Sequence, residues 1–316
     1  MKVKAFIFLI GYYCHPNQSD NKMENYTHYA KQADVFKHLV LCEVLKNEKP
    51  GWYIETNSAC AMYHLEHTPE QEHGIYYFLR KASMDEILKA SCYYKLEREA
   101  QQNGCYYGSP ALAMKIWGKK ADRYYFFDIE KKSLENVGNF AEQAQVDDRI
   151  VIRNCDSLKG AMDLLPMLST SCFLHIDPYE IDKKADNGPT YLDVFIEATR
   201  LGMQCLLWYG FMTGEDQLKM DKYIVSHLQA SGVTNVVWAK MILKSIQKDT
   251  IVCNPGISGS GLLASNLSDK SNERLLELSR RLEVLYKEAR YKDQDGSLYY
   301  EGVNLNDPVS YNSFIK

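Results

Sequence analysis

Short apolar runs alternate with longer amphipathic segments over most of the 316-residue chain. A short apolar run bounded by polar residues predicts a strand, and apolar residues spaced three and four apart predict a helix. The alternation of the two predicts an α/β protein with a mainly parallel, doubly wound sheet. The predicted strands are residues 52–56, 123–127, 149–153, 172–176, 204–209, 236–242 and 250–252.

Helices are predicted between these strands. The first contains Ala33-Asp-Val-Phe-Lys-His38 and has an apolar stripe on one side. Residues 65–104 have no strand signal and contain two amphipathic segments, which predicts a small helical insertion after the first strand. Gly108-Ser109-Pro110 opens the next helix: either Ser109 caps it, or its exposed amides bind a carboxylate or phosphate. Further helices are predicted at residues 111–117, 131–144, 157–165, 190–201, 216–230 and 269–292.

Three successive strands lead into an aspartate, at Asp128, Asp156 and Asp177. In open α/β sheets ligands bind outside the carboxyl ends of the strands, and an acid after the second strand typically takes the ribose hydroxyls of a nucleoside. An acid after the third strand can hydrogen-bond the exocyclic amine of an adenine. The repetition therefore predicts a nucleoside pocket along one edge of the sheet. The alternative is that each aspartate only caps the helix that follows it.

The stretch from Cys172 to Glu180 is the strongest candidate for the reacting group. Asp177 stands at the end of an apolar strand, where its carboxylate can accept a hydrogen bond or proton from an amine. Pro178 fixes the local backbone, and Tyr179 offers a flat face on which a base can stack. The alternative is an ordinary strand that ends in a Pro-Tyr turn.

The composition limits the kinds of ligand, metal site and cellular compartment that we expect for this chain. The net charge is −4, which argues against tight, sequence-independent binding of nucleic acid but leaves room for a local basic patch. The nine cysteines form no CxxC pair, which disfavours a zinc ribbon and suits a reducing cytoplasm. His64, His67 and His73 lack a matching Cys or carboxylate pattern, so we predict no metal site. No stretch is long and apolar enough to span a membrane.

The ends of the chain differ in pattern from its middle. Residues 1–22 begin with a short apolar run but lack a small-residue cleavage site, so we interpret them as an N-terminal extension rather than a secretory signal. Residues 23–265 form the predicted main domain, and residues 266–316 a C-terminal helix and tail. The helix either packs on the core or meets a protein partner. We predict a hairpin turn at Ile257–Gly261, with a contact to a phosphate as the alternative, and a loosely ordered tail from Asp293.

Taken in order, these pieces resemble the RlmJ-type methyltransferases, which modify adenine N6 in 23S ribosomal RNA. The resemblance implies a class I S-adenosylmethionine-dependent methyltransferase-like (Rossmann-like) fold, S-adenosylmethionine as cofactor, and nucleic acid as substrate, RNA rather than DNA. The shared pieces are residues 23–26, Ala33–His38, Gly108-Ser-Pro110, Asp128, Asp156, Ile176–Glu180, Leu207-Trp-Tyr209 and Gly259-Ser-Gly261.

The resemblance also implies roles for single residues. Asp177, with Pro178 and Tyr179, would hold the target amine and its base, and Tyr26 would contact the substrate nucleotide. The cofactor would be bound by Lys37, His38, Asn57, Ser109, Asp128, Asp156 and Ser157.

The chain departs from the family in three places. The family has Asp-Pro-Pro-Tyr, whereas a single proline separates Asp177 from Tyr179 here. Asn57-Ser-Ala-Cys60 replaces a His and a glycine-containing turn, and Ser157 replaces a glycine. The single-proline motif is similar to that of the three-Cys-motif partner proteins. The sequence therefore leaves a second hypothesis open, a protein of methyltransferase fold that no longer methylates and serves as a nucleic-acid-binding or partner-binding subunit.

Overall fold

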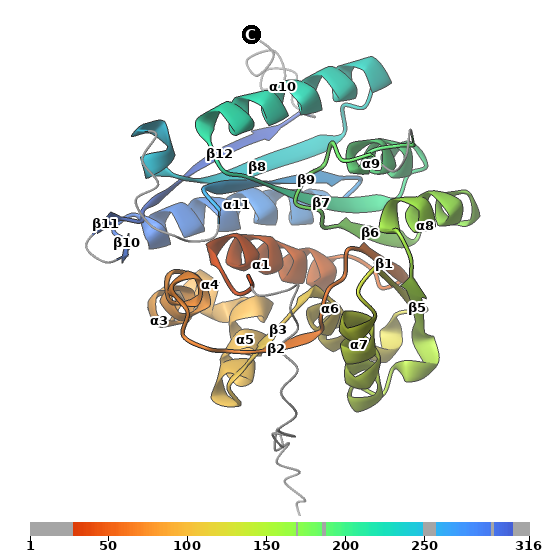
Figure 1. Ribbon diagram of the computed structural model, residues 1–316, viewed down its shortest axis with the longest axis horizontal. Coiled ribbons are helices and arrows are strands. Elements are labelled where there is room, and N and C mark those ends of the chain that lie inside the picture. Colours follow the sequence, from red (N-terminus) through yellow and green to blue (C-terminus); the bar gives the residue numbers. More distant parts are fainter. Residues whose placement is uncertain (1–27, 169, 185–187, 249–256, 292–293, 306–316) are drawn as a thin grey trace, which may run out of the picture.

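The computed structural model describes residues 28–168, 170–184, 188–248, 257–291 and 294–305 (Figure 1). Eight strands form the central sheet. They are β1 (Trp52–Thr56), β4 (Arg123–Asp128), β5 (Ile150–Asn154), β6 (Cys172–Ile176), β7 (Gln204–Phe211), β8 (Val236–Leu243), β9 (Gly259–Ser265) and β12 (Leu298–Asn304).

The order of strands across the sheet is β12-β8-β9-β7-β6-β1-β4-β5. Strands β5, β4, β1, β6 and β7 are parallel, β9 runs antiparallel between β7 and β8, and β12 runs antiparallel on β8. The chain winds outward from β1 through β4 to β5, and then in the other direction through β6 to β7. The point of reversal lies between β1 and β6, where such sheets bind ligands. The doubly wound, Rossmann-like fold of a class I methyltransferase is thus confirmed.

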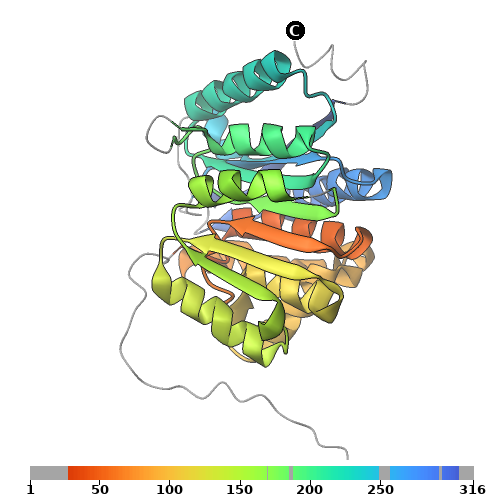
Figure 2. The same cartoon turned by 90° about the vertical axis from the view of Figure 1, so that its right-hand side faces the viewer.

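Helices cover both faces of the sheet (Figure 2). Because side chains alternate along a strand, Phe173 points into the core on one face and Leu174 into the core on the other. One face carries α8 (Ser157–Leu164), α9 (Tyr191–Arg200) and α10 (Gly214–Ser231), and the other carries α1 (Gln32–Asn47), α6 (Ser109–Trp117), α7 (Lys131–Gln143) and α11 (Asp269–Tyr286).

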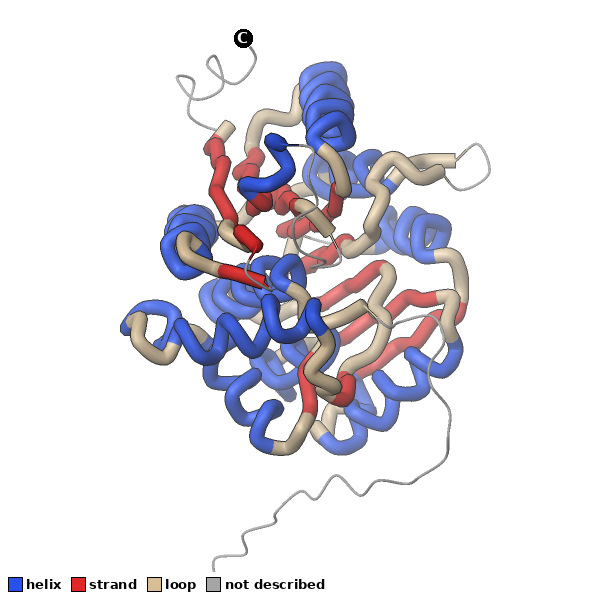
Figure 3. Tube along the Cα trace, turned by 60° about the vertical axis from the view of Figure 1, so that its left-hand side comes forward, coloured by secondary structure: helices blue, strands red, loops and turns tan. Residues whose placement is uncertain are grey.

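The predicted helical insertion is present between β1 and α6. Two short strands, β2 (Met62–His64) and β3 (Cys105–Tyr107), pair antiparallel at its base. Its helices are α2 (Pro69–Gln71), α3 (Tyr77–Ala82), α4 (Glu86–Ala90) and α5 (Cys92–Gln102), with an irregular turn at Glu72–Tyr76 between α2 and α3. In Figure 1 the helices α3, α4 and α5 lie on the far side of α1 from β7, β8 and β9. Figure 3 shows from another side how the helices (blue) surround the strands (red).

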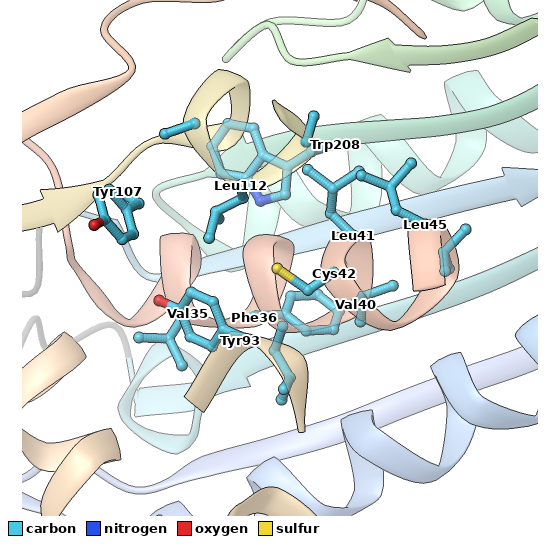
Figure 4. Close-up of a cluster of buried hydrophobic side chains, with 14 of the residues drawn as sticks. Val35, Phe36, Val40, Leu41, Cys42, Leu45, Tyr93, Tyr107, Leu112 and Trp208 are labelled. Atoms are coloured by element: carbon cyan, nitrogen blue, oxygen red, sulfur yellow. The ribbon is translucent and has the colours of Figure 1, made fainter. Parts of the chain in front are cut away.

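Helix α1 is buried on every side rather than on the single stripe that the sequence predicts. It packs against β7 and β9 on one side and against α5, α6 and α11 on the others, so that Lys37 and His38 are buried with the apolar residues. Figure 4 shows Phe36 and Tyr93 among the side chains of this cluster. A helix that is enclosed in this way fixes the position of every side chain it carries, polar ones included.

The hairpin turn predicted at Ile257–Gly261 is wrong, because Gly259 to Gly261 belong to β9. Gly259 lies opposite Phe211 and Gly261 opposite Tyr209 on the neighbouring strand. A Cβ atom at residue 261 would stand 2.3 Å from the Tyr209 ring, so glycine is required by close packing rather than by a turn. The strand predicted at residues 250–252 lies outside the described residues.

The prediction of a loosely ordered tail from Asp293 is also wrong for residues 294–305, which the structure describes. Strand β12 pairs with β8 along its whole length. Before it, two strands of two residues each, β10 (Arg290–Tyr291) and β11 (Gln294–Asp295), pair antiparallel. Helix α11 ends at Tyr286, and its apolar residues Leu275, Leu278 and Leu282 are buried against α1 and the sheet. Of the two alternatives for this helix, packing on the core is the one observed.

Candidate active site

A pocket of about 320 Å³ opens at the carboxyl ends of β1 and β6, where the winding of the sheet reverses. Its walls come from α1, the loop after β1, the start of α6 and the segment after β6, and Trp208 of β7 also lines it. Of the residues that the sequence singles out, Lys37, His38, Asn57, Ser109, Asp177, Pro178 and Tyr179 line this pocket.

Asp177 forms a buried ion pair with Lys37. The Lys37 Nζ lies 2.6 Å from Asp177 Oδ2 and 3.4 Å from Asp34 Oδ1, and it stands 4.9 Å from the centre of the Trp208 ring. Burial lowers the pKa of Lys37, but the two carboxylates outweigh it and the pKa lies above its usual value. Burial raises the pKa of Asp177, and Lys37 offsets only part of that rise. Asp177 is thus a carboxylate held in place by a cation on a rigid helix.

Several polar atoms in this pocket are buried without a hydrogen-bond partner among the described residues. They are Asp177 Oδ1, His38 Nε2, Ser58 Oγ and Trp208 Nε1. A buried polar atom left unpaired costs about 1–3 kcal/mol, so proteins rarely gather several of them. A ligand that carries donors and acceptors would satisfy them. The pocket is therefore built for a polar ligand.

His38 is held in the neutral form. Its Nδ1 lies 2.7 Å from the hydroxyl of Tyr106, a residue of β3, and burial lowers the pKa of His38 well below its usual value. The neighbouring cation Lys37 lowers it further. The unpartnered Nε2 faces a pocket in which a neutral imidazole can donate or accept one hydrogen bond, depending on its tautomer.

The loop after β1 is shaped by backbone conformations that favour glycine. Asn57 and Ala59 have φ angles of 55° and 50°, although neither is glycine. The Asp128 carboxylate holds this loop: Oδ2 accepts the amide of Ala59 at 2.8 Å, and Oδ1 accepts the amide of Glu130 at 2.8 Å. Asp128 therefore fastens the loop from outside the pocket lining.

Helix α6 begins at Ser109, with Gly108 at its N-cap and no capping hydrogen bond from a side chain. The alternative that Ser109 caps the helix is thus wrong. A Cβ atom at residue 108 would stand 2.1 Å from the carbonyl oxygen of Cys60, so only glycine fits where the two loops cross. Ser109 occupies the first turn and faces the pocket.

Asp156 and Ser157 lie beyond the pocket lining. Asp156 caps α8 by accepting the amide of Lys159 at 3.2 Å. The Ser157 hydroxyl donates to Asn57 Oδ1 at 3.1 Å and lies 2.9 Å from the hydroxyl of Tyr191, which also accepts from Asn57 Nδ2 at 2.9 Å. This closed ring of hydrogen bonds ties the loop after β1 to α8 and α9. The sequence gives no signal for Tyr191, which stands at the start of an amphipathic helix.

Aromatic side chains stand at the mouth of the pocket. The rings of Tyr29 and Tyr63 stack with centroids 4.5 Å apart, and His28 Nδ1 lies 2.9 Å from Glu70. Tyr179 is 42% exposed, and its carbonyl accepts the amide of Gly210 at 3.2 Å. Tyr26, the residue expected to contact the substrate, lies outside the described residues.

A second buried network lies behind Asp177. Glu55 Oε1 is 3.1 Å from His175 Nδ1, and the hydroxyl of Tyr53 donates to Glu55 Oε2 at 2.9 Å. Glu55 and His175 have no solvent exposure and stand opposite each other in the pairing of β1 with β6. Together with Asp177 they form a cluster of possible metal ligands within 4.8 Å of one another. Lys37 already supplies a cation to Asp177 in this arrangement.

Comparison with known proteins finds a similarity to a methyltransferase of ribosomal RNA. Ribosomal RNA large subunit methyltransferase J of Haemophilus influenzae is 24% identical over 255 residues, which is 76% of this chain and 84% of the relative. The chain resembles the RlmJ-type methyltransferases. The resemblance read from the ordered motifs is thus confirmed by a similarity that extends over most of the chain.

A solved structure supports the fold. Protein LPL1258 of Legionella pneumophila superposes with a TM-score of 0.66 at 19% identity, over 88% of this chain and 98% of that one. No family model matches the chain. Among the described residues, no helix is both long enough and apolar enough to cross a membrane.

Proposed function

We propose that this protein is an S-adenosylmethionine-dependent methyltransferase that acts on the exocyclic N6 amine of adenine in RNA. The observation that carries the proposal is the unpartnered oxygen of Asp177, which is buried in a pocket at the reversal point of the sheet. S-adenosylmethionine supplies an activated methyl group when bound. The similarity to Ribosomal RNA large subunit methyltransferase J supports the reaction class and the choice of RNA.

In this proposal Asp177 binds the target amine through Oδ1, while Lys37 holds Oδ2 at 2.6 Å and fixes the orientation of the carboxylate. The amine donates one N–H to Asp177 Oδ1, and as the nitrogen gains its methyl group this proton passes to the Asp177 carboxylate. Tyr179, which lines the pocket and is partly exposed, stacks on the base. The adenine must leave its stack or come from a single strand to reach this depth. Catalysis here consists mainly of holding the amine in line with the methyl donor.

The cofactor's two ends require different surroundings. The unpartnered atoms of His38 and Ser58 suit the polar amino-acid end of the cofactor. For the adenosine end we assign the edge where β4 and β5 end, near Asp128 and Asp156. Ile129 follows Asp128 directly and is 70% exposed, so it offers an apolar face to a purine at that edge. The sequence contains Ile129 but gives no reason to single it out.

The first test is calorimetric binding of S-adenosylhomocysteine. Ile129→Ser removes an exposed apolar side chain and leaves the core untouched, and we expect it to weaken binding about tenfold, as the loss of roughly 1.4 kcal/mol would. The matched control is Met84→Ser, which removes a side chain that is 75% exposed on the insertion and should bind normally. Equal binding by both variants would refute the adenosine site.

A second test addresses the reaction itself. Asp177→Asn keeps the shape of the side chain but removes the charge, and we expect it to abolish methyl transfer to RNA while S-adenosylhomocysteine still binds. The single proline of the Asp177-Pro-Tyr179 motif favours the second candidate function, a subunit of this fold that binds RNA or a partner without methylating. No cofactor binding by the folded wild-type protein would refute the enzyme and favour that candidate.

A further inference from the structure

The helical insertion carries a second groove, of about 390 Å³, away from the candidate active site. It lies between the irregular turn at Glu72–Tyr76, α3 and α5. The side chains that matter for its chemistry are His67, Glu72, Tyr76, Arg80, Tyr94 and Arg98.

The groove has a positive balance in a chain whose net charge is −4. Arg80 and Arg98 are exposed, and neither is paired with a carboxylate in the part of the chain that the structure describes. Arg98 donates to the side-chain oxygen of Gln101 at 3.5 Å, and Arg80 lies over the ring of Tyr77 at 5.6 Å. The carboxylate in the lining, Glu72, is 2.7 Å from His67 Nδ1. Two guanidinium groups are therefore free to bind an anion.

The groove also has an aromatic wall. The rings of His67 and Tyr76 stack with centroids 4.2 Å apart and planes inclined by 6°. The side chain of His67 is 69% exposed, so its outer face is open to a flat ligand. Free guanidinium groups beside an exposed stacking surface are what single-stranded nucleic acid requires, since phosphates bind the cations and bases stack on the rings.

A segment of the insertion that contacts the mouth of the candidate active site leads along the chain to the groove. The hydroxyl of Tyr29, which lines the active-site pocket, donates to the carbonyl of His64 at the start of the insertion. His28, at the same mouth, contacts Glu70 of α2 at 2.9 Å. The segment from His64 to Glu70 then leads directly to Glu72 and Tyr76 in the groove. Residues 64–72 therefore connect the mouth of the pocket, where Tyr29 and His28 lie, to the lining of the groove.

We propose that this groove binds the single-stranded RNA that flanks the target nucleotide, with Arg80 and Arg98 on phosphates and a base stacked on the pair formed by His67 and Tyr76. The proposal rests on the proposed function, because it names where that function's substrate is held. It gives an acidic protein a local source of affinity for RNA.

The test is the salt dependence of binding to a mixed-sequence, single-stranded RNA of twelve nucleotides, followed by fluorescence anisotropy. Each phosphate contact to a single strand contributes about 0.7 to the slope of log K against log salt. Arg80→Ala with Arg98→Ala should therefore lower the slope by about 1.4, which weakens binding about 25-fold at about 0.1 M salt. Tyr76→Leu should weaken binding and leave the slope unchanged, because stacking releases no counterions.

The matched control is Lys219→Ala with Lys222→Ala, which removes the same charge from exposed positions on α10, on the opposite face of the sheet. This variant should keep the wild-type slope. An unchanged slope in the arginine variant, an equal loss in both variants, or a wild-type protein that binds no RNA would each overturn the proposal. Binding of S-adenosylhomocysteine, measured on the same samples, tells whether the proposed function survives that outcome.

Discussion

Replacing Lys37 with methionine should destabilise the protein strongly, because it leaves the buried carboxylate of Asp177 without its cation. Lys37 Nζ lies 2.6 Å from Asp177 Oδ2, with only 8% and 10% of the two side chains exposed. At that distance the gross attraction is about 6 kcal/mol for an effective dielectric constant of about 20. Loss of one member of a buried pair typically costs about 3–5 kcal/mol, since the remaining charge keeps its desolvation penalty. We expect a loss of that size in the free energy of unfolding at pH 8.

The loss should depend on pH through Asp177. Its pKa in the folded protein is already raised above the usual value by burial, with Lys37 opposing the rise. A carboxyl group whose pKa is raised in the folded protein makes the protein less stable as the pH rises. The loss begins near the pKa of the group in the unfolded chain, about 3.9, and is complete above its pKa in the folded protein. Removal of Lys37 raises the pKa of Asp177 in the folded protein further, so the stability continues to fall up to a higher pH. The destabilisation should therefore be larger at pH 8 than at pH 5.

Urea unfolding, followed by circular dichroism at pH 5 and pH 8, measures both effects. Lys46→Met is the matched control on the same helix: Lys46 is 52% exposed and lies 3.8 Å from Glu43, so its loss should cost less than about 1 kcal/mol at either pH. Asp177→Asn added to Lys37→Met should recover part of the loss, because no buried charge then remains. Equal destabilisation by Lys37→Met and Lys46→Met would refute the assignment of a buried ion pair.

Two glycine substitutions test the geometry of the pocket. Gly210→Ala places a Cβ atom 2.7 Å from the half-exposed ring of Tyr179, so the ring must move; we expect a higher KM for RNA, with folding and cofactor binding retained, and unchanged RNA kinetics would count against Tyr179 as the stacking residue. Gly108→Ala places a Cβ atom 2.1 Å from the carbonyl oxygen of Cys60, a backbone atom, and should cost about 1–3 kcal/mol in urea unfolding. Gly138→Ala, in the middle of α7 with only an ordinary contact at 3.5 Å, should instead stabilise the protein by about 0.5–1 kcal/mol.

The chain's local patterns determine most of the sheet. Strands β1 and β6 occupy Trp52–Thr56 and Cys172–Ile176, the ranges that their apolar runs predict. A short buried strand needs only a continuous apolar segment, and this property is visible without knowledge of its neighbours. The Asp177-Pro-Tyr179 motif is likewise visible in sequence, because its chemistry and its place after a strand are both local. Sequence alone therefore indicates the fold class and the candidate reacting carboxylate.

Other features exist only because distant segments meet. From the sequence, the glycines of β9 are interpreted as a turn. In the structure they are strand residues, and the rings of Tyr209 and Phe211 occupy the space that their side chains would fill.

The partner of Asp177 is also decided by the tertiary structure. Its cation comes from Lys37, which is 140 residues away in sequence. The pairing of Glu55 with His175 follows from the register of β1 against β6. The groove of the insertion likewise joins arginines from two helices. A periodic pattern indicates which face of an element is buried. Which side chain it faces depends on how the elements pack, and this packing is determined by the core as a whole.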